Sequence, residues 1–403
     1  MPARRAALVA LIASALGLVF AAYSTYDYAQ QLDRQVHAVH CSFIPGAPVS
    51  TDADNPCKAA LFSPYSAVFR ASYWGGVPIS LFGLGAFAFF VGFAVYLRMG
   101  DRRLPRSAYP TFVALTLGPV AVSIVLLTLS VTHLHALCKL CVGIYVSSAV
   151  LAVSAFLGMR SHARDVKAAG AEEGPGWWTP IASLLAIGTC ALAPAIVYVA
   201  LLPNYRPLLD KCGKLATMSD PHHALLKIPT AQPIRAVVLF EDPLCPTCKA
   251  FHERLVDEGI FEQLDVTLAM FPLDSECNWM LDRSLHPGAC VLAKAVICGG
   301  NQKARAILEW AYDQQDRLRE LGKQGAEPLT AKVAERWGRE VTACVTGKEA
   351  GIQLNQQLHF AANNHIPVST PQMFLGDERI CDEDTDLGLK YTLAQLAPEV
   401  LHE

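Results

Sequence analysis

The sequence predicts a membrane α-helical bundle with five spans, followed by a C-terminal α/β domain that carries a helical insertion. Three observations lead to this fold class. The chain of 403 residues has a mean hydropathy of +0.29 and only 17% charged residues, which is too apolar for a purely soluble protein. Five uncharged runs are long enough, at about 20 residues each, to cross a bilayer. From residue 234 onward, β-branched strand patterns alternate with helical ones.

The five uncharged runs are the predicted spans, at 6–26, 77–97, 111–132, 140–159 and 177–202. Lys and Arg in the short connecting segments set the orientation of such a bundle. They gather before the first run, between the second and third, and between the fourth and fifth: Arg4, Arg5, Arg98, Arg102, Arg103, Arg106, Arg160, Arg164 and Lys167. We therefore expect a cytoplasmic N-terminus and an external C-terminal domain. An alternative is a cleaved signal peptide in place of the first span, which leaves the other orientations unchanged.

The cysteines follow this topology. Thirteen cysteines are typical of an oxidising compartment. All except Cys190 fall on the external side or at the external end of a span, and Cys190 is expected to be a small buried apolar side chain. The net charge of −3 argues against a nucleic-acid-binding protein.

The C-terminal domain begins with a buried strand. Residues 203–233 are rich in Pro and His and are predicted to be a linker, and 234–241 (IRAVVLFE) form the strand. A second strand is expected near 265–273, helices over 289–365, and a last strand at 372–375. This order predicts an α/β domain.

The motif DPLCPTC follows the first strand directly, so that Cys245 opens a helix. A helix N-terminus favours a thiolate, and the thiolate is the nucleophile in disulfide exchange. We therefore predict that Cys245 is the attacking thiol and that Cys248, one turn later, is the resolving thiol. A zinc site or a static bridge is the alternative, but no second ligand pair of zinc-ribbon spacing follows.

This domain resembles the thioredoxin superfamily in its DsbA-like branch. The matching pieces are Cys-Pro-Thr-Cys after the strand and Thr370-Pro371 before the last strand. The resemblance implies a cis peptide bond at Pro371, facing the cysteine pair. The central Pro-Thr dipeptide has no histidine and leaves the reduction potential of the pair open.

Six further cysteines lie in the external C-terminal region. Cys277 and Cys290 flank a short excursion and are predicted to form a static disulfide. The other four allow three pairings, of which elimination favours Cys298 with Cys344 and Cys212 with Cys381.

A second CxxC pair lies in HLHALCKLCVGIY (133–145), at the external start of the fourth span. Cys138 and Cys141 are interpreted as a redox pair, because Cys41 and Cys57 lie in a loop on the same side and could carry electrons to them. A zinc site that includes His133 and His135, and inert core thiols, are the alternatives. A short amphipathic helix is expected after Cys57.

The membrane half resembles the vitamin K epoxide reductase family, and the whole chain looks like its bacterial homologues fused to a thioredoxin-like domain. Four spans that form the core, two loop cysteines, Ser-Pro-Tyr after the second cysteine, Gly-Val-Pro before the second span and CxxC at the fourth carry the resemblance. It implies that Cys141 faces a quinone, that Cys138 is its partner, and that Cys41 and Cys57 are the shuttle.

The resemblance also implies two residues of the quinone pocket, Tyr145 and Ser80. Ordinary packing within the span is the alternative role of Tyr145. Ile79 stands where the mammalian enzymes have asparagine, which favours quinone reduction over epoxide reduction. The interval from Cys41 to Cys57 is also longer than is usual in the family.

The expected organisation is a quinone-reductase domain over 1–160, a cytoplasmic loop, fifth span and external linker over 161–233, and a thioredoxin-like domain over 234–403. The expected activity is oxidation of secreted protein dithiols with ubiquinone or menaquinone as acceptor, in a bacterial inner membrane and with no metal. Alternatives are an isomerase or reductase with outward electron flow, or a metal-binding membrane protein.

Overall fold

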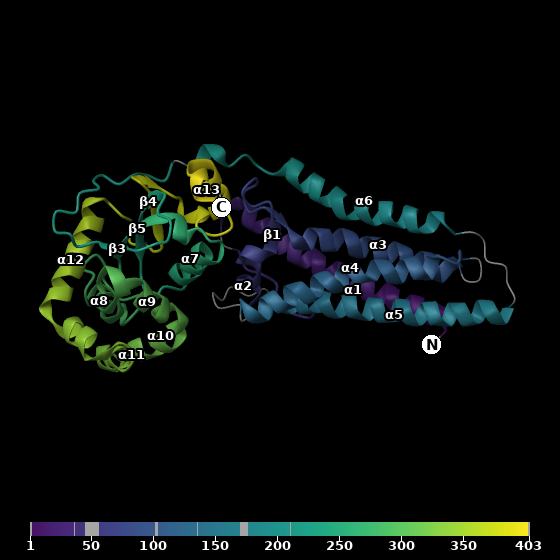
Figure 1. Ribbon diagram of the computed structural model, residues 1–403, viewed down its shortest axis with the longest axis horizontal. Coiled ribbons are helices and arrows are strands. Elements are labelled where there is room, and N and C mark those ends of the chain that lie inside the picture. Colours follow the sequence, from purple (N-terminus) through teal and green to yellow (C-terminus); the bar gives the residue numbers. More distant parts are fainter. Residues whose placement is uncertain are drawn as a thin grey trace. The chain divides into compact units, whose positions relative to one another are not determined.

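The computed structural model describes residues 2–35, 37–44, 56–100, 104–134, 136–169, 176–209 and 211–401 (Figure 1). The chain divides into two compact units, Met1–Pro203 and Asn204–Glu403. Together they confirm the predicted fold class of a helical membrane bundle and an α/β domain with a helical insertion.

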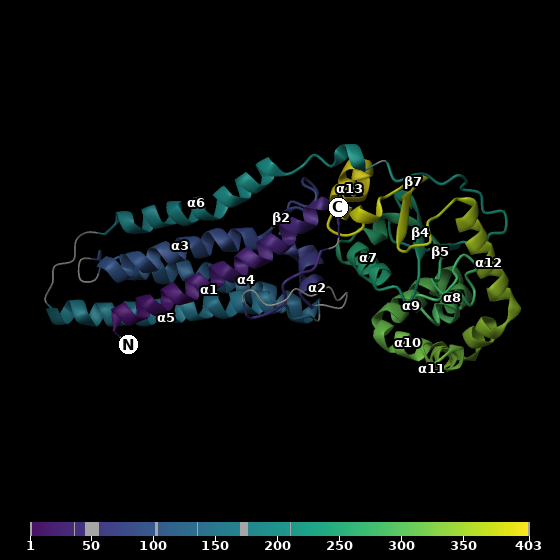
Figure 2. The same ribbon diagram turned by 180° about the vertical axis from the view of Figure 1, so that it is seen from behind.

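The first unit contains five helices that are long and apolar enough to cross a membrane, within its described residues. A helix satisfies its own backbone hydrogen bonds, as a chain in lipid must. The helices are α1 (Ala3–Gln30), α3 (Ile79–Gly100), α4 (Ala108–Thr132), α5 (Lys139–Ala169) and α6 (Trp178–Leu201). Helix α1 packs against α3 and α5, α4 packs against α5, and α6 packs against α3 (Figure 2).

Small residues allow the helices of this bundle to approach closely. Gly17 of α1 lies directly against the ring of Phe87 on α3, where a Cβ atom would overlap the ring. Phe93 and Phe112 stack with their ring centroids 4.9 Å apart and join α3 to α4. Close contact of this kind replaces the hydrophobic driving force that is weak between helices in lipid.

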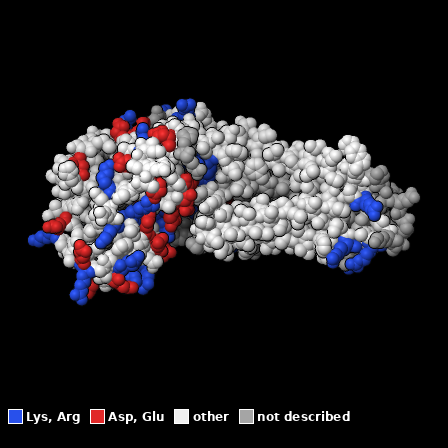
Figure 3. All heavy atoms as spheres, in the orientation of Figure 1, with Lys and Arg blue, Asp and Glu red and all other residues white. Residues whose placement is uncertain are grey.

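The surface of the spans is apolar. Leu185 and Ile196 of α6 are 68% and 67% exposed, as expected for side chains that face lipid. Figure 3 shows charged side chains over the second unit and almost none along the spans, except for Lys and Arg at one end of the bundle.

Helix α1 continues beyond residue 26, where the predicted span ends. It runs to Gln30 and a 3-10 turn extends it to Asp33. Asp27 and Tyr28 are thereby 2% and 1% exposed. The Tyr28 hydroxyl donates to the carbonyl of Gly75, next to the short hairpin of β1 (Ala67–Val68) and β2 (Val77–Pro78).

The short helix expected after Cys57 begins one residue before it. Helix α2 spans Pro56–Phe62, and a 3-10 turn follows at Pro64–Ser66. The guanidinium of Arg70 donates to the Ser63 carbonyl at 2.5 Å and to the Ser66 hydroxyl at 2.9 Å, and so holds the end of this segment.

The second unit is built on a five-stranded sheet in the order β3-β5-β4-β6-β7. Strands β4 and β5 are parallel and the other pairings are antiparallel. The crossover from β4 to β5 runs through α7 (Pro246–Asp257). The strands are β3 (Leu226–Ile228), β4 (Arg235–Glu241), β5 (Leu264–Met270), β6 (Gln372–Leu375) and β7 (Glu378–Arg379). A β-α-β half followed by a β-β-α half is the thioredoxin arrangement.

Five helices form the insertion between β5 and β6, where the sequence predicts helices over 289–365. They are α8 (Ala289–Cys298), α9 (Gly300–Asp313), α10 (Gln315–Gly322), α11 (Ala326–Thr346) and α12 (Lys348–Asn363). Helix α13 (Leu389–Leu396) follows the last strand. The apolar faces of the insertion are continuous with the core of the sheet.

Residues 204–233 differ from the predicted linker. They belong to the second unit, because β3 pairs with β5 and buries Leu226 and Ile228. A disulfide from Cys212 to Cys381 holds the same stretch to the end of the sheet. A strand of three residues is too short to show a period in the sequence.

Candidate redox site

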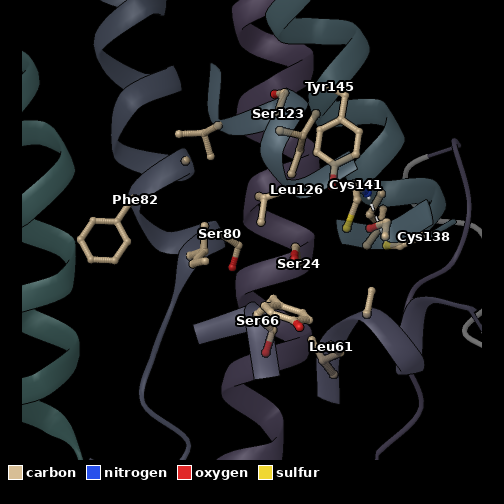
Figure 4. A pocket seen from close by; sticks show the side chains of 18 of the residues that line it. Ser24, Leu61, Ser66, Ser80, Phe82, Ser123, Leu126, Cys138, Cys141 and Tyr145 are labelled. Atoms are coloured by element: carbon tan, nitrogen blue, oxygen red, sulfur yellow. Dashed lines mark hydrogen bonds between the residues drawn. The ribbon is translucent and has the colours of Figure 1, made fainter. Parts of the chain in front are cut away.

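A largely apolar cavity of about 550 Å³ lies within the membrane unit (Figure 4). Its walls come from α1, α2, α3, α4 and α5, with a small contribution from α6. This volume and lining are typical of a pocket for a small organic ligand.

The membrane CxxC pair lies in the wall of this cavity. Cys138 immediately precedes α5 and Cys141 lies in its first turn, so that the free amide groups of the helix N-terminus surround the pair. The backbone N–H of Cys141 donates to the Cys138 sulfur at 3.4 Å. Both cysteines are free thiols, and Cys138 is 5% exposed. This environment favours a thiolate at Cys138.

Tyr145 lies one turn after Cys141 on the same face of α5, and its hydroxyl points toward the Cys141 side chain (Figure 4). Cys141, Tyr145 and Ser130 of α4 all line the cavity. Ser80 lines the cavity from α3 and accepts a hydrogen bond from the Thr25 hydroxyl at 3.0 Å. Ile79, the departure from the mammalian pattern, also lines the cavity.

The loop cysteines form a disulfide. Cys41 and Cys57 are bonded, and Cys57, on α2, also lines the cavity and is 4% exposed. The structure therefore brings Cys57, Cys138, Cys141 and Tyr145 to one space. Most of the loop between the two bonded cysteines lies outside the described residues.

Two charged residues at this cavity were missed by the sequence analysis. Asp27 of α1 and His40 are hydrogen-bonded to each other, with 2.6 Å between Oδ1 and Nδ1. Asp27 is the first charge after the uncharged run, and His40 directly precedes Cys41, so both positions gave a usable signal.

The alternative zinc site would include His133 and His135. The ring of His133 packs against Tyr65, with centroids 6.0 Å apart, and His135 lies outside the described residues. Arg102 and Arg103, two of the basic residues from which the orientation is predicted, also lie outside the described residues. Among the described residues, the one cluster of possible metal ligands is Cys212, Cys381 and Glu383, whose cysteines are bonded to each other.

The second CxxC pair begins α7 in the α/β unit. Cys245 is the N-cap residue of this helix, and Cys248 is fully buried behind it. The Cys245 sulfur lies 2.9 Å from the Thr247 hydroxyl and 3.5 Å from the carbonyl of Thr370, whose bond to Pro371 is cis. Pro371 thus follows a residue that contacts the pair.

The two thiols differ in acidity. A hydrogen bond from the Cys248 thiol outweighs the opposing effect of burial and lowers the pKa of Cys245 to about 6, and the Thr247 contact acts in the same direction. Burial raises the pKa of Cys248, and the buried Glu241 and Asp242 raise it further. Cys245 is therefore suited to attack and Cys248 to resolve.

A histidine near Cys245 comes from another part of the chain. Nδ1 of His286 lies 2.7 Å from Oδ2 of Asp242, the residue that directly follows β4. Burial alone would lower the pKa of His286, but the contact with Asp242 raises it. His286 lies in the segment closed by the Cys277–Cys290 disulfide. The Pro-Thr dipeptide between Cys245 and Cys248 does not indicate that a histidine lies near the pair.

A buried charge network continues behind Cys248. Nδ1 of His252 lies 3.5 Å from Glu241, and Nε2 lies 3.5 Å from Glu309, which Arg305 contacts at 2.7 Å. Burial would lower the pKa of His252, but the two carboxylates raise it to about 9.

One family model matches part of the chain. Residues 8–156 match the model of the vitamin K epoxide reductase family. This segment is a vitamin K epoxide reductase family domain. It contains four of the five spans and all four cysteines at or near the membrane cavity, and α6 and the α/β unit lie beyond it. No curated protein matches the chain.

Solved structures of thioredoxin-like proteins also match. One is a periplasmic thioredoxin-like protein from Salmonella enterica serovar Typhimurium, at 18% identity and a TM-score of 0.27, over 45% of this chain and 94% of that one. Another is Proteus mirabilis ScsC in a transitional conformation, at 18% identity and a TM-score of 0.25, over 43% of this chain and 73% of that one.

Four disulfides join described residues of the chain. In addition to Cys41–Cys57, they are Cys277–Cys290, Cys298–Cys344 and Cys212–Cys381. The last two are the pairings that elimination favours. With these bonds made, the remaining thiols are the two CxxC pairs and Cys190.

The His252 network predicts a pH dependence of stability. Because the folded-state pKa of His252, about 9, lies above the ordinary value of 6.5, its contribution is complete below about pH 6.5 and is lost as the pH rises through about 9. The full contribution is about 3 kcal/mol. Unfolding of the full chain in detergent should therefore lose more stability between these pH values in the natural protein than in His252→Gln. Equal losses in both proteins would contradict the assignment.

Proposed function

We propose that the chain is a membrane thiol–disulfide oxidoreductase that passes electrons from dithiols of secreted proteins to a membrane quinone. The observation that carries this proposal is the cavity of the vitamin K epoxide reductase family domain, which holds the Cys141 thiol, the Tyr145 phenol and the loop cysteine Cys57 in one apolar space. An apolar pocket with one phenol beside a thiol fits a quinone head group, whose carbonyl oxygens accept hydrogen bonds.

The proposed transfer begins at the α/β unit. The dithiol of a secreted protein reduces the Cys245–Cys248 disulfide, and the thiolate of Cys245 then attacks the loop disulfide at Cys57. Cys41 transfers the electrons to Cys138, and Cys141 is the last thiol of the chain. The low pKa of Cys245 supports its role as the attacking group.

A quinone, when bound, accepts the two electrons and two protons that one dithiol releases. Tyr145 is proposed to hold a quinone carbonyl by donating its hydroxyl hydrogen, and Ser80 to line the opposite wall. The surrounding side chains exclude water from the thiols. Ubiquinone and menaquinone both fit this chemistry.

The proposed location is a bacterial inner membrane, with the α/β unit on the periplasmic or external side. Lys and Arg gather at one end of the bundle, which supports placing that end on the cytoplasmic side of the membrane. Fusion of the two units keeps the redox partner from diffusing away and raises its effective concentration.

The redox state of Cys245 and Cys248 in growing cells tests the direction of flow. Alkylation in acid-quenched cells should find the pair mainly oxidised, because the quinone pool keeps withdrawing electrons. Depletion of quinone should shift the pair to the reduced form, and added quinone should restore it. A pair that stays reduced in quinone-replete cells would contradict the proposal and support a repair enzyme with outward electron flow.

A further inference from the structure

Asp27 and His40 form a hydrogen-bonded pair at one end of α1. Oδ1 of Asp27 lies 2.6 Å from Nδ1 of His40, and Oδ2 accepts the backbone N–H of His40 at 2.8 Å. Asp27 is 2% exposed. A carboxylate in a membrane span is costly to bury, so that ionisable residues there mark functional sites more often than structural ones.

The pair lies at the cavity where the cysteines meet. Asp27 and His40 both line it, together with Cys57, Cys138 and Cys141. His40 is also the neighbour of Cys41 in the chain. The pair is therefore next to both partners of the proposed transfer from the loop cysteines to the membrane cysteines.

No other described group of the cavity wall has comparable acid–base properties. Among the described lining residues, Asp27 is the only carboxylate, His40 is the only imidazole, and none is Lys or Arg. The remaining titratable groups that face the cavity are phenols and thiols: Tyr28 of α1, Tyr65 after α2, Tyr145 and Cys141 of α5, and Cys138 before α5.

The geometry orients the imidazole. Because Nδ1 of His40 is held by Asp27, Nε2 is left as the nitrogen that can accept a proton. The rings of Tyr23 and Tyr26 flank the imidazole, with centroids 4.7 and 6.2 Å away. A carboxylate that holds one nitrogen of a histidine fixes its tautomer and its ring orientation.

We propose that His40, oriented by Asp27, accepts and returns the proton in the exchange between the loop pair and the membrane pair. The inference rests on the proposed function. The Cys41 thiol loses its proton to Nε2 of His40, a Cys41–Cys138 bond forms, and the Cys138–Cys141 bond breaks. Cys141 leaves as a thiolate and receives the proton.

The second half of the exchange has the same balance. Cys57 gives up its proton and attacks Cys41, which restores the loop disulfide and releases Cys138 as a thiolate that is then protonated. Two electrons and two protons have moved from the loop pair to the membrane pair. The structure has the bonding pattern of this product, with a loop disulfide and two membrane thiols.

The test compares pH profiles of the full-length protein in lipid vesicles, with reduced ribonuclease A as the dithiol and menadione as the quinone. In His40→Gln, quinol formation at about pH 6.5 should fall about 100-fold, the usual contribution of a proton-transfer group. The deficit should shrink toward about pH 9, because Cys41 then ionises without assistance. Asp27→Asn should show a smaller deficit with the same pH trend.

The chain offers a matched control in the neighbouring pair of Asp33 and His37. These residues are also hydrogen-bonded, with 2.7 Å between Oδ2 and Nε2, but their side chains are 49% and 33% exposed and neither lines the cavity. His37→Gln should keep the rate and the pH profile of the natural protein. The rate of each variant is divided by the rate of the natural protein at the same pH. Any effect of Cys245 ionisation is common to both rates and therefore cancels.

Two results would overturn the inference: an unchanged rate in His40→Gln, or a loss of equal size at every pH, which would indicate a purely structural role. Mass spectrometry of the Cys41–Cys57 disulfide checks folding, and Asp27→Asn serves as the test if His40→Gln fails to form that bond. A natural protein that produces no quinol would instead refute the proposed function, so that the two failures are distinguishable.

Discussion

Replacing Cys141 by alanine is expected to abolish quinol formation, with a loss of about 1,000-fold or more, as for the removal of an essential nucleophile. Cys141 is the thiol toward which Tyr145 points in the cavity of the membrane unit. Without it, Cys138 cannot form its disulfide, and no two-electron step remains at the quinone end. The measurement is the absorbance change on quinol formation by the full-length protein in vesicles.

Cys190→Ala is the matched control for this variant. Cys190 is a free thiol in the same unit, on α6, but it does not line the cavity. The control should keep the natural rate. Electrons that can no longer leave should also accumulate in Cys141→Ala, so that Cys245 and Cys248 become reduced in cells. A Cys141→Ala protein with full quinone reduction would show that the proposed electron exit is wrong.

Alkylation of Cys245 in the reduced protein is expected to have its midpoint near pH 6, far below that of an ordinary thiol. Since the thiolate exists only in the reduced form, a depressed pKa stabilises that form above about pH 6, and this stabilisation is lost as the pH falls through 6. At pH 7 the effect is about tenfold, or about 30 mV toward a more oxidising pair. Mass spectrometry of the Cys245 peptide separates it from the other thiols.

Thr247→Val sharpens this prediction. The substitution preserves shape and removes the hydroxyl that lies 2.9 Å from the Cys245 sulfur. The midpoint should therefore rise by about half a pH unit to one unit, while Cys248 stays unreactive because its pKa is raised by burial. A midpoint near pH 8.5 in the natural protein, or earlier alkylation of Cys248, would contradict the assigned roles.

The spans and the α/β domain could be predicted from the sequence because each rests on a local pattern. Uncharged runs of sufficient length mark the helices, and a β-branched run before CxxC marks β4 and α7. The family match of residues 8–156 supports the resemblance stated for the membrane half.

What the sequence analysis missed depends on contacts between distant residues. Asp27 lies just past the uncharged run, and only the extension of α1 buries it beside His40. His286 reaches Asp242 from a segment 44 residues away in the chain. Strand β3 was not predicted, because three residues are too few to show an alternating apolar pattern. Its pairing with β5 places it in the sheet.

The most direct test of the central claim is the stoichiometry of the reaction in purified full-length protein. Reduced ribonuclease A and menadione are supplied in vesicles, and quinol and protein disulfides are counted in the same sample. The proposed function predicts one quinol for each disulfide formed, at a rate that depends on Cys245 and Cys141. Disulfide formation without quinol, or no reaction in the natural protein, would contradict it.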